Sequence, residues 1–283
     1  GILALPVPAR PRLRPEQSGA VAEATELLRQ SQRHGRAGDA VSQLALAQAA
    51  QARWQDLGDG VGLAGAYYEE AQALLRQGKL ERAAEVAALC AEGAAGTGDV
   101  ERQILALLLQ AEAEEAQGLA DPARAAAYQA LTLARLYGAL WAQADACAQL
   151  ASIAELQSAY REARHYLAQA HRLAVSLEPQ GERAFNLQNL LAQVEVALGR
   201  YADAEALLDR SLDPRRAPDA PQALDWPLNL KAQLLVVQGR FEQAQAVAES
   251  GLAGGHAAWD VGSWFKENLA AALIARGQTS RAL

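Results

Sequence analysis

The sequence predicts an all-α protein built from about seven antiparallel pairs of helices. Hydrophobic residues make up 51% of the 283-residue chain but aromatic residues only 5%, so alanine and leucine supply most of the apolar content. Both are strong helix formers, whereas β-strands favour β-branched and aromatic residues. A glycine also recurs at intervals of 38 to 43 residues. Self-similarity at such a period is typical of α-solenoids, in which each repeat packs against its neighbours.

Small residues recur at fixed positions around that glycine. An alanine follows the glycine by five residues in every copy, and further small residues lie seven residues before it and twelve after it. The glycine column is Gly35, Gly78, Gly118, Ser158, Gly199, Gly239 and Gly277, and the alanine column is Ala40, Ala83, Ala123, Ala163, Ala204, Ala244 and Ala282. Small side chains let helix axes approach closely, and glycine is favoured where a helix ends in the left-handed conformation.

The first helix of each pair is expected to end at this glycine. Apolar residues recur at helical spacing before it, as in Ile104, Leu107, Leu108 and Ala111. The first helices are therefore expected over 19–34, 60–77, 101–117, 139–157, 182–198, 224–238 and 260–276.

The second helix of each pair is expected to begin just after the glycine and to end at chain breakers. These breakers include Gly58-Asp59-Gly60, Pro179-Gln180-Gly181 and the segment from Pro214 to Pro221. The second helices are expected over 37–57, 80–95, 120–137, 160–177, 201–212 and 241–253, with a partial helix from Thr279.

The order of small residue, glycine, apolar or aromatic residue and alanine resembles the tetratricopeptide repeat (TPR). Tyr160, Tyr201 and Phe241 fill the aromatic position, and the resemblance covers residues 19–283. The period is roughly six residues longer than that of most TPRs, and the usual proline after the second helix is mostly missing. In these two departures the chain resembles the long-helix TPR sensor domains of bacterial transcription regulators and signal-transduction ATPases. The resemblance implies a right-handed superhelix whose first helices line a concave groove.

Charge and apolar content exclude several classes of partner. The net charge is −7, and Arg10, Arg12 and Arg14 stand at one end, which leaves the remainder more acidic still. An acidic body is unsuited to duplex nucleic acid, and no apolar run is long enough to span a membrane. Two cysteines, Cys90 and Cys147, make no disulfide framework, and we expect no bond between them. A cytoplasmic protein is predicted.

No motif in the sequence predicts catalysis, a cofactor or a metal. The segment Gly93–Gly98 superficially resembles a phosphate loop, but Asp99 follows where a lysine is required, so an inter-repeat turn is the better interpretation. His165 and His171 are six residues apart, which does not fit the i, i+4 spacing of a helical metal pair. We therefore predict a protein that is not an enzyme.

The first helices of the later repeats carry candidate binding residues. Transferring the groove-facing positions of peptide-binding TPR domains selects five amides and two indoles: Asn186, Asn189, Gln193, Trp226, Asn229, Gln233 and Trp264. Amides donate and accept hydrogen bonds, so they suit the main chain of an extended peptide. A glutamine-rich composition would explain the same residues without a function.

Earlier repeats present charged groups at their groove positions. These groups are Arg29, Arg33 and Arg76, followed by Glu112, Glu115 and Glu155. The acidic middle could attract a basic segment, although charges on a helix are more often a solvated face.

Two domains are expected: a proline- and arginine-rich linker or N-terminal tail over 1–18, and a TPR-like superhelical domain over 19–283 with a truncated last repeat. The tail of a secretory signal is the alternative for the first segment. The predicted function is a non-catalytic module that binds a protein or peptide partner in the groove. One alternative is a regulatory domain that senses a small-molecule effector. A second is a scaffold that forms homodimers through the C-terminal repeat, where the last helix lacks its partner.

Overall fold

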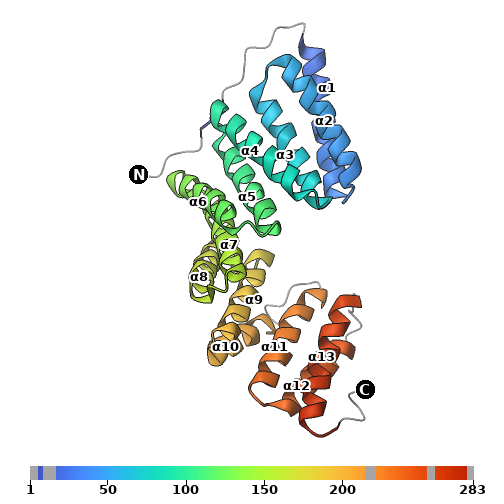
Figure 1. The fold of residues 1–283 in the computed structure, drawn as a ribbon, viewed down its shortest axis with the longest axis vertical. Coiled ribbons are helices and arrows are strands. Elements are labelled where there is room, and N and C mark those ends of the chain that lie inside the picture. Colours follow the sequence, from blue (N-terminus) through green and yellow to red (C-terminus); the bar gives the residue numbers. More distant parts are fainter. Residues whose placement is uncertain (1–5, 9–16, 214–220, 254–258, 279–283) are drawn as a thin grey trace. The chain divides into compact units, whose positions relative to one another are not determined.

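The computed structural model describes residues 6–8, 17–213, 221–253 and 259–278 (Figure 1). The described part is all-helical, and it divides into two compact units, unit 1 (Gly1–Ala159) and unit 2 (Tyr160–Leu283). None of the described helices combines the length and hydropathy needed to cross a bilayer. The expected linker falls mostly outside the described residues, as does the partial helix from Thr279.

Thirteen α-helices are described, and each agrees with its expected range to within three residues at either end. Unit 1 contains α1 (Ser18–Arg36), α2 (Ala40–Leu57), α3 (Gly60–Arg76), α4 (Leu80–Thr97), α5 (Val100–Ala116), α6 (Ala120–Leu136) and α7 (Leu140–Leu156). Unit 2 contains α8 (Tyr160–Leu177), α9 (Glu182–Ala197), α10 (Tyr201–Ser211), the 3-10 helix η2 (Pro221–Leu224), α11 (Asp225–Val237), α12 (Phe241–Ala253) and α13 (Trp259–Ala275).

Each turn inside a helix pair is built in the same way. At Gly78 the backbone adopts a φ of 72°, and Lys79 N donates to Leu74 O at 2.9 Å, which is the hydrogen bond of a Schellman C-cap. The same bond closes the corresponding turns at Asp39, Leu119, Ala159, Arg200, Arg240 and Gln278. Ser158 takes the glycine position with a φ of 56°, so the chain keeps the turn geometry even where glycine is missing.

The first repeat departs from the expected alignment by three residues. The left-handed glycine is Gly38, with a φ of 80°, and Gly35 lies inside α1. A Cβ atom at Gly35 would lie 2.6 Å from Nε2 of Gln43, so the missing side chain leaves room for that amide. Gln43 therefore replaces Ala40 in the alanine column, and Nε2 of Gln43 donates to Oε2 of Glu69 at 2.9 Å.

The glycine-rich segment Gly93–Gly98 also differs from expectation, because most of it is not a turn. Helix α4 continues through Thr97, and only Gly98 is left-handed, with a φ of 72°. The side chain of Asp99 then accepts from Arg102 N at 3.0 Å and caps α5. The segment is therefore a helix end followed by a capped helix start.

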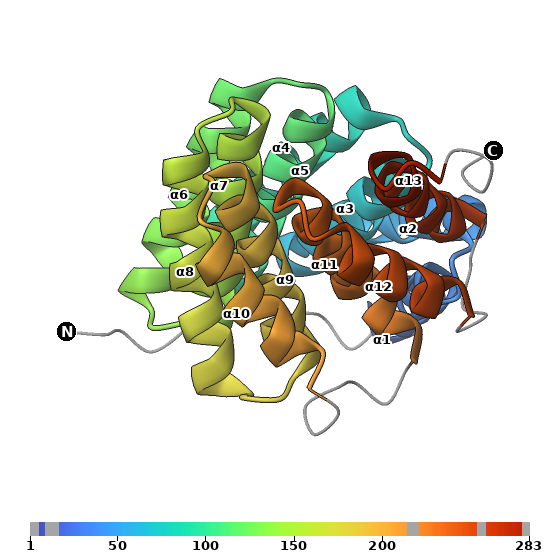
Figure 2. The same cartoon turned by 90° about the horizontal axis from the view of Figure 1, so that it is seen from below.

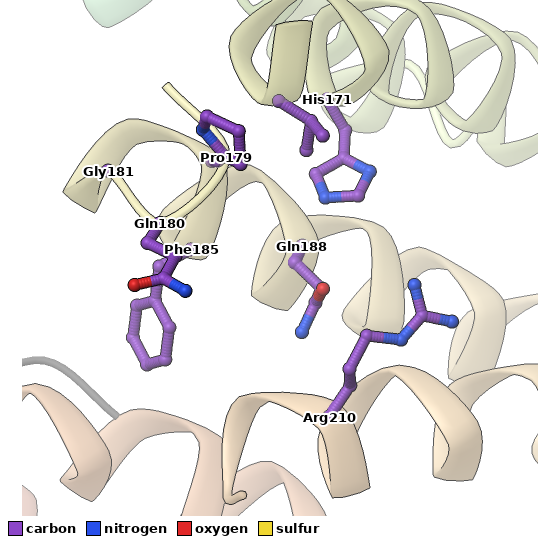
Figure 3. A pocket seen from close by; sticks show the side chains of 9 residues that line it. His171, Pro179, Gln180, Gly181, Phe185, Gln188 and Arg210 are labelled. Carbon is purple, nitrogen blue, oxygen red and sulfur yellow. The ribbon is translucent and has the colours of Figure 1, made fainter. Parts of the chain in front are cut away.

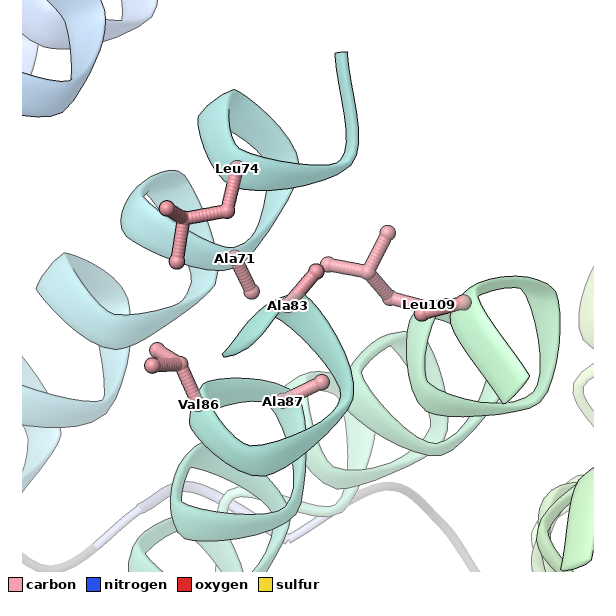
Figure 4. Close-up of a cluster of buried hydrophobic side chains, with 7 residues drawn as sticks. Ala71, Leu74, Ala83, Val86, Ala87 and Leu109 are labelled. Carbon is pink, nitrogen blue, oxygen red and sulfur yellow. The ribbon is translucent and has the colours of Figure 1, made fainter. Parts of the chain in front are cut away.

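The small-residue columns form the centre of the packing. Five members of the alanine column are fully buried: Ala83, Ala123, Ala163, Ala204 and Ala244. Figure 4 shows one resulting cluster, in which leucine and valine side chains of α3, α4 and α5 surround alanines. Because alanine leaves little space between the axes, neighbouring helices contact along their length.

First helices pack against the first helices of the next repeat. Within unit 1, α3 contacts both α1 and α5, and α5 contacts α7. Within unit 2, α11 contacts both α9 and α13, and Figure 2 shows α11, α12 and α13 packed side by side. The odd-numbered helices of each unit thus form a continuous face.

Neither cysteine in the described residues forms a disulfide. Cys90 and Cys147 are both buried and free, as expected from the sequence. Desolvation raises the pKa of Cys90 to about 12 and that of Cys147 to about 11. Both therefore remain thiols at neutral pH and serve as small packing residues.

A charged network joins α10 to α11 and predicts a measurable pH dependence. Lys231 Nζ lies 2.9 Å from Oε1 of Glu205, and Arg240 Nη1 lies 2.8 Å from the same atom. Hydrogen bonds from these two cations lower the pKa of Glu205 to about 2. The ionised form therefore stabilises the fold above the unfolded-state pKa of about 4.3, and this contribution is lost as the pH falls through the folded-state value.

We expect Glu205→Gln to lower the free energy of unfolding by about 1–2 kcal/mol at pH 7, discounted because the carboxylate is partly exposed. The difference between the two proteins should shrink as the pH falls below about 4.3. Urea unfolding between pH 7 and pH 3 measures it, and a difference that does not change with pH would contradict this assignment.

Candidate functional site

The face of odd-numbered helices in unit 1 is hollowed. A cavity of about 400 Å³ lies across α3, α5 and α7, and we call it the first-helix groove. Its lining is Tyr68 and Gln72 of α3, Leu105, Leu108, Leu109 and Glu112 of α5, and Asp145, Ala148 and Gln149 of α7. An adjoining cavity of about 330 Å³ adds Leu75 and Arg76.

Helical spacing brings these side chains to one face. Residues three and four apart are neighbours on a helix, and the lining residues of each helix follow that spacing, as in Leu105, Leu108, Leu109 and Glu112. The wall from α5 is therefore apolar along most of its length, while Gln72, Asp145 and Gln149 add polar groups from the neighbouring helices. Apolar walls with a few polar groups are the usual composition of binding sites.

Three carboxylates on this face are only partly solvated. Desolvation raises the pKa of Glu112, Glu115 and Glu155. Mutual repulsion adds to this, since Glu112 raises the pKa of Glu115 and Glu115 raises that of Glu155. Ser152 and Gln149 donate hydrogen bonds to Glu115, which fixes it in place. A cation placed among these groups would relieve both effects.

Six of the seven predicted binding residues face outward in unit 2. Asn186, Gln193, Gln233 and Trp264 are exposed, whereas Trp226 and Asn229 are half-buried. They come from α9, α11 and α13, whose contacts make one face. We call these six residues the amide face. Asn268, which the sequence analysis missed, joins them because its Nδ2 donates to Oδ1 of Asn229 at 2.7 Å.

Asn189 is placed differently from the other six. It is fully buried, and its Oδ1 accepts a hydrogen bond of 2.6 Å from Oγ of Ser211 in α10. Gln188 donates to the same hydroxyl at 2.7 Å, so the three side chains form one internal network. Asn189 is therefore turned toward the second helix of its own repeat, and it has no exposed surface in this structure.

Trp226 has a packing role as well as a half-exposed surface. It packs against the cluster of buried residues that includes Leu208, Leu230 and Leu234. Its indole therefore anchors α11, while its remaining surface belongs to the amide face.

The sequence predicted a groove along the first helices and placed Arg76 and Glu112 in it, and both residues line these cavities. The apolar part of the lining was not predicted, although the groove-facing positions of the two preceding repeats are Leu105, Leu108 and Asp145. Leu108 is half-buried, and so it belongs partly to the core and partly to the groove. Spacing alone does not separate these two environments.

Comparison with known proteins identifies the fold. The sequence matches no protein-family model and no curated protein. Among solved structures, a signal-transduction ATPase of the STAND class with a TPR sensor, PH0952 from Pyrococcus horikoshii, superposes with a TM-score of 0.74 and 14% identity. The match covers 88% of this chain and 38% of PH0952, so the chain spans well under half of that protein.

A quorum sensor has a similar fold. The apo form of NprR from B. thuringiensis gives a TM-score of 0.66 at 14% identity, over 93% of this chain and 74% of NprR. NprR in complex with its cognate peptide NprX gives a TM-score of 0.60 at 12% identity, over 96% of this chain and 77% of that one. At these identities the likeness defines the fold and nothing further. The chain thus has the fold of a TPR-like helical solenoid.

Proposed function

We propose that the chain is a non-catalytic module that binds an extended segment of a partner protein or peptide along its first helices. The observation that carries this proposal is the first-helix groove, to which three successive first helices contribute side chains. Helix axes in contact lie about 8–10 Å apart, so the groove matches roughly six residues of extended chain at about 3.4 Å each.

The lining specifies the chemistry of that segment. Tyr68, Leu105 and Leu108 offer an apolar surface to an aliphatic or aromatic side chain of the partner. Gln72 and Gln149 can hydrogen-bond the partner's main chain. Arg76 already lowers the pKa of Glu112, but no cation does so for Glu115 or Glu155, and these two carboxylates favour an arginine or lysine of the partner. The proposed ligand is therefore an extended segment that combines an apolar residue with a basic one.

The amide face of unit 2 is proposed as a further contact surface for the partner. Its amides suit main-chain groups and its two indoles suit apolar side chains. The peptide complex of NprR supports the proposal by analogy, since a protein of similar fold binds a peptide. Buried free thiols suit a reducing compartment, so we place the module in the cytoplasm.

Homodimerisation remains the competing arrangement at α13. Trp264 and Ile274 on that helix are 43% and 58% exposed, so they offer apolar surface to a second copy of the chain. Light scattering over a range of concentrations separates the two possibilities. A mass that rises to twice 30.0 kDa would favour self-association over partner binding.

A peptide selection tests the groove directly. Random peptides displayed on phage are selected on the full chain, and the affinity of the recovered peptides is measured in solution. Leu108→Asp is expected to weaken binding by at least about tenfold, because it places a charge on the apolar lining. Peptides enriched in a basic residue beside an apolar one are the expected outcome.

Leu89→Asp is the matched control. Leu89 lies on the second helix α4 and is 43% exposed, so the substitution adds the same charge outside the groove. We expect less than about a twofold change in peptide affinity for this variant. Equal losses for the two variants, with both still folded by circular dichroism, would overturn the proposed function.

A further inference from the structure

A separate pocket lies within unit 2, away from the amide face residues. Its volume is about 310 Å³, and it is enclosed by the end of α8, the turn that follows it, and parts of α9 and α10 (Figure 3). The lining includes His171 and Val175 of α8, Pro179 of the turn, Phe185 and Gln188 of α9, and Arg210 of α10. This volume lies at the lower end of the range for small-molecule sites.

The pocket combines an apolar wall with fixed polar groups. Val175, Pro179 and Phe185 supply apolar surface on one side. Gln188 is held in place because its Nε2 donates to Leu207 O at 3.0 Å and to Ser211 Oγ at 2.7 Å. Figure 3 shows His171 above Gln188, with the Gln188 side chain between Phe185 on one side and Arg210 on the other. Gln188 is therefore fixed inside the pocket, whereas Arg210 lies exposed at its rim and can turn toward a ligand.

Its charge is positive. No carboxylate belongs to the lining within the described residues, and no hydrogen bond or ion pair there engages the Arg210 guanidinium. Desolvation lowers the pKa of His171, and the nearby Arg210 and Arg172 lower it further. At the edge of the pocket, the acidic side chain of Glu178 packs against Gly181. At neutral pH the pocket thus presents one unpaired guanidinium beside a neutral imidazole.

We propose that this pocket binds a small monocarboxylate whose apolar body packs on Phe185 and whose carboxylate pairs with Arg210. A guanidinium matches the geometry of a carboxylate through two parallel hydrogen bonds. One fixed positive charge suits a monoanion better than a phosphate dianion, which needs more charge to offset its desolvation. Such a site makes unit 2 the part of the chain that senses a small molecule, independently of peptide binding in the first-helix groove.

Binding is expected to be coupled to protonation of His171. A bound carboxylate opposes the effect of Arg210 and Arg172, so it raises the pKa of the imidazole. Proton uptake then accompanies binding, and the affinity for the anion increases as the pH falls through the pKa of the imidazole in the complex. The Glu178 carboxylate at the edge of the pocket repels an anionic ligand, which lowers the affinity at either pH.

The probe is 3-phenylpropionate, titrated into the full chain by calorimetry at pH 7.5 and pH 5.5. We expect saturable binding with one site, no binding of the isosteric amine 3-phenylpropylamine, and weaker binding of phenyl phosphate. Arg210→Ala should reduce the affinity by at least about tenfold, since it removes the one permanent charge among the described lining residues. His171→Gln should retain binding at pH 7.5 and lose the increase at pH 5.5.

Arg172→Ala is the matched control, because Arg172 carries the same charge on α8 but does not line the pocket. Its affinity for 3-phenylpropionate is expected to change by less than about twofold. Equal losses in the two arginine variants would indicate a general charge effect and overturn the site. If the wild-type chain shows no saturable binding with about 10 mM probe, the Kd is too weak for a specific site, and the proposal is overturned as well.

Discussion

Replacing Phe265 with alanine is expected to lower the free energy of unfolding of unit 2 by about 3–5 kcal/mol. Phe265 is 2% exposed and is the largest fully enclosed apolar side chain of α13. Its ring packs against Gly251 of α12, where an added Cβ would lie only 2.8 Å from Cδ1 of the ring. The phenyl ring fills the space that the missing side chain of Gly251 leaves. Removing the ring therefore leaves a cavity between α12 and α13.

The neighbouring residue provides the control for this prediction. Trp264 is 43% exposed, and Trp264→Ala is expected to change the free energy of unfolding by less than about 0.5 kcal/mol. Urea denaturation of both variants measures the difference. Similar losses for the two variants would contradict the assignment of Phe265 to the core and Trp264 to the surface of the amide face.

Gly62→Ala is expected to destabilise unit 1 by about 2 kcal/mol, although alanine is the better helix former. Gly62 is a buried residue of α3, and the indole of Trp54 lies directly against it. An added Cβ would be 2.6 Å from both Cε2 and Cε3 of that ring. Trp54 is 2% exposed and has no free space to move into, so the helix or the ring must shift.

The same substitution should have the opposite sign at Gly96. This residue lies near the end of α4 with no atom within 4 Å of an added Cβ, so Gly96→Ala gains helix propensity at no steric cost. We expect stabilisation by about 0.5–1 kcal/mol, measured by thermal unfolding. A destabilising Gly96→Ala, or a neutral Gly62→Ala, would contradict the packing described for α3 and α4.

Most of the fold is predictable from the sequence because every repeat obeys the same constraints. Left-handed turns at Gly78, Gly118, Gly199 and Gly239 favour glycine, and close helix axes favour alanine, so both residues mark their positions in the sequence. The prediction placed the turn of the first repeat at Gly35, but the left-handed residue is Gly38. Gly35 lies inside the helix, where its missing side chain makes room for Gln43. A glycine that accommodates a neighbour cannot be told from one that ends a helix by composition alone.

The binding surfaces are less predictable, for physical reasons that the residues illustrate. Asn189 and Gln193 are four residues apart and both polar, yet Asn189 is buried by its bond to Ser211. Leu108 has the spacing of a core residue, yet part of its surface lines the groove. The pocket around Arg210 depends on a turn that brings three helices together, which helical periodicity does not encode.

The most direct test of partner binding in the groove maps where a bound peptide lies. A peptide selected on the full chain is resynthesised with a photoreactive benzoylphenylalanine at its apolar position, cross-linked, and located by mass spectrometry. Binding along the first helices predicts cross-links to the groove lining, at Tyr68, Leu105, Leu108 or Ala148. Cross-links concentrated on exposed leucines of the second helices, such as Leu89 and Leu136, would contradict it.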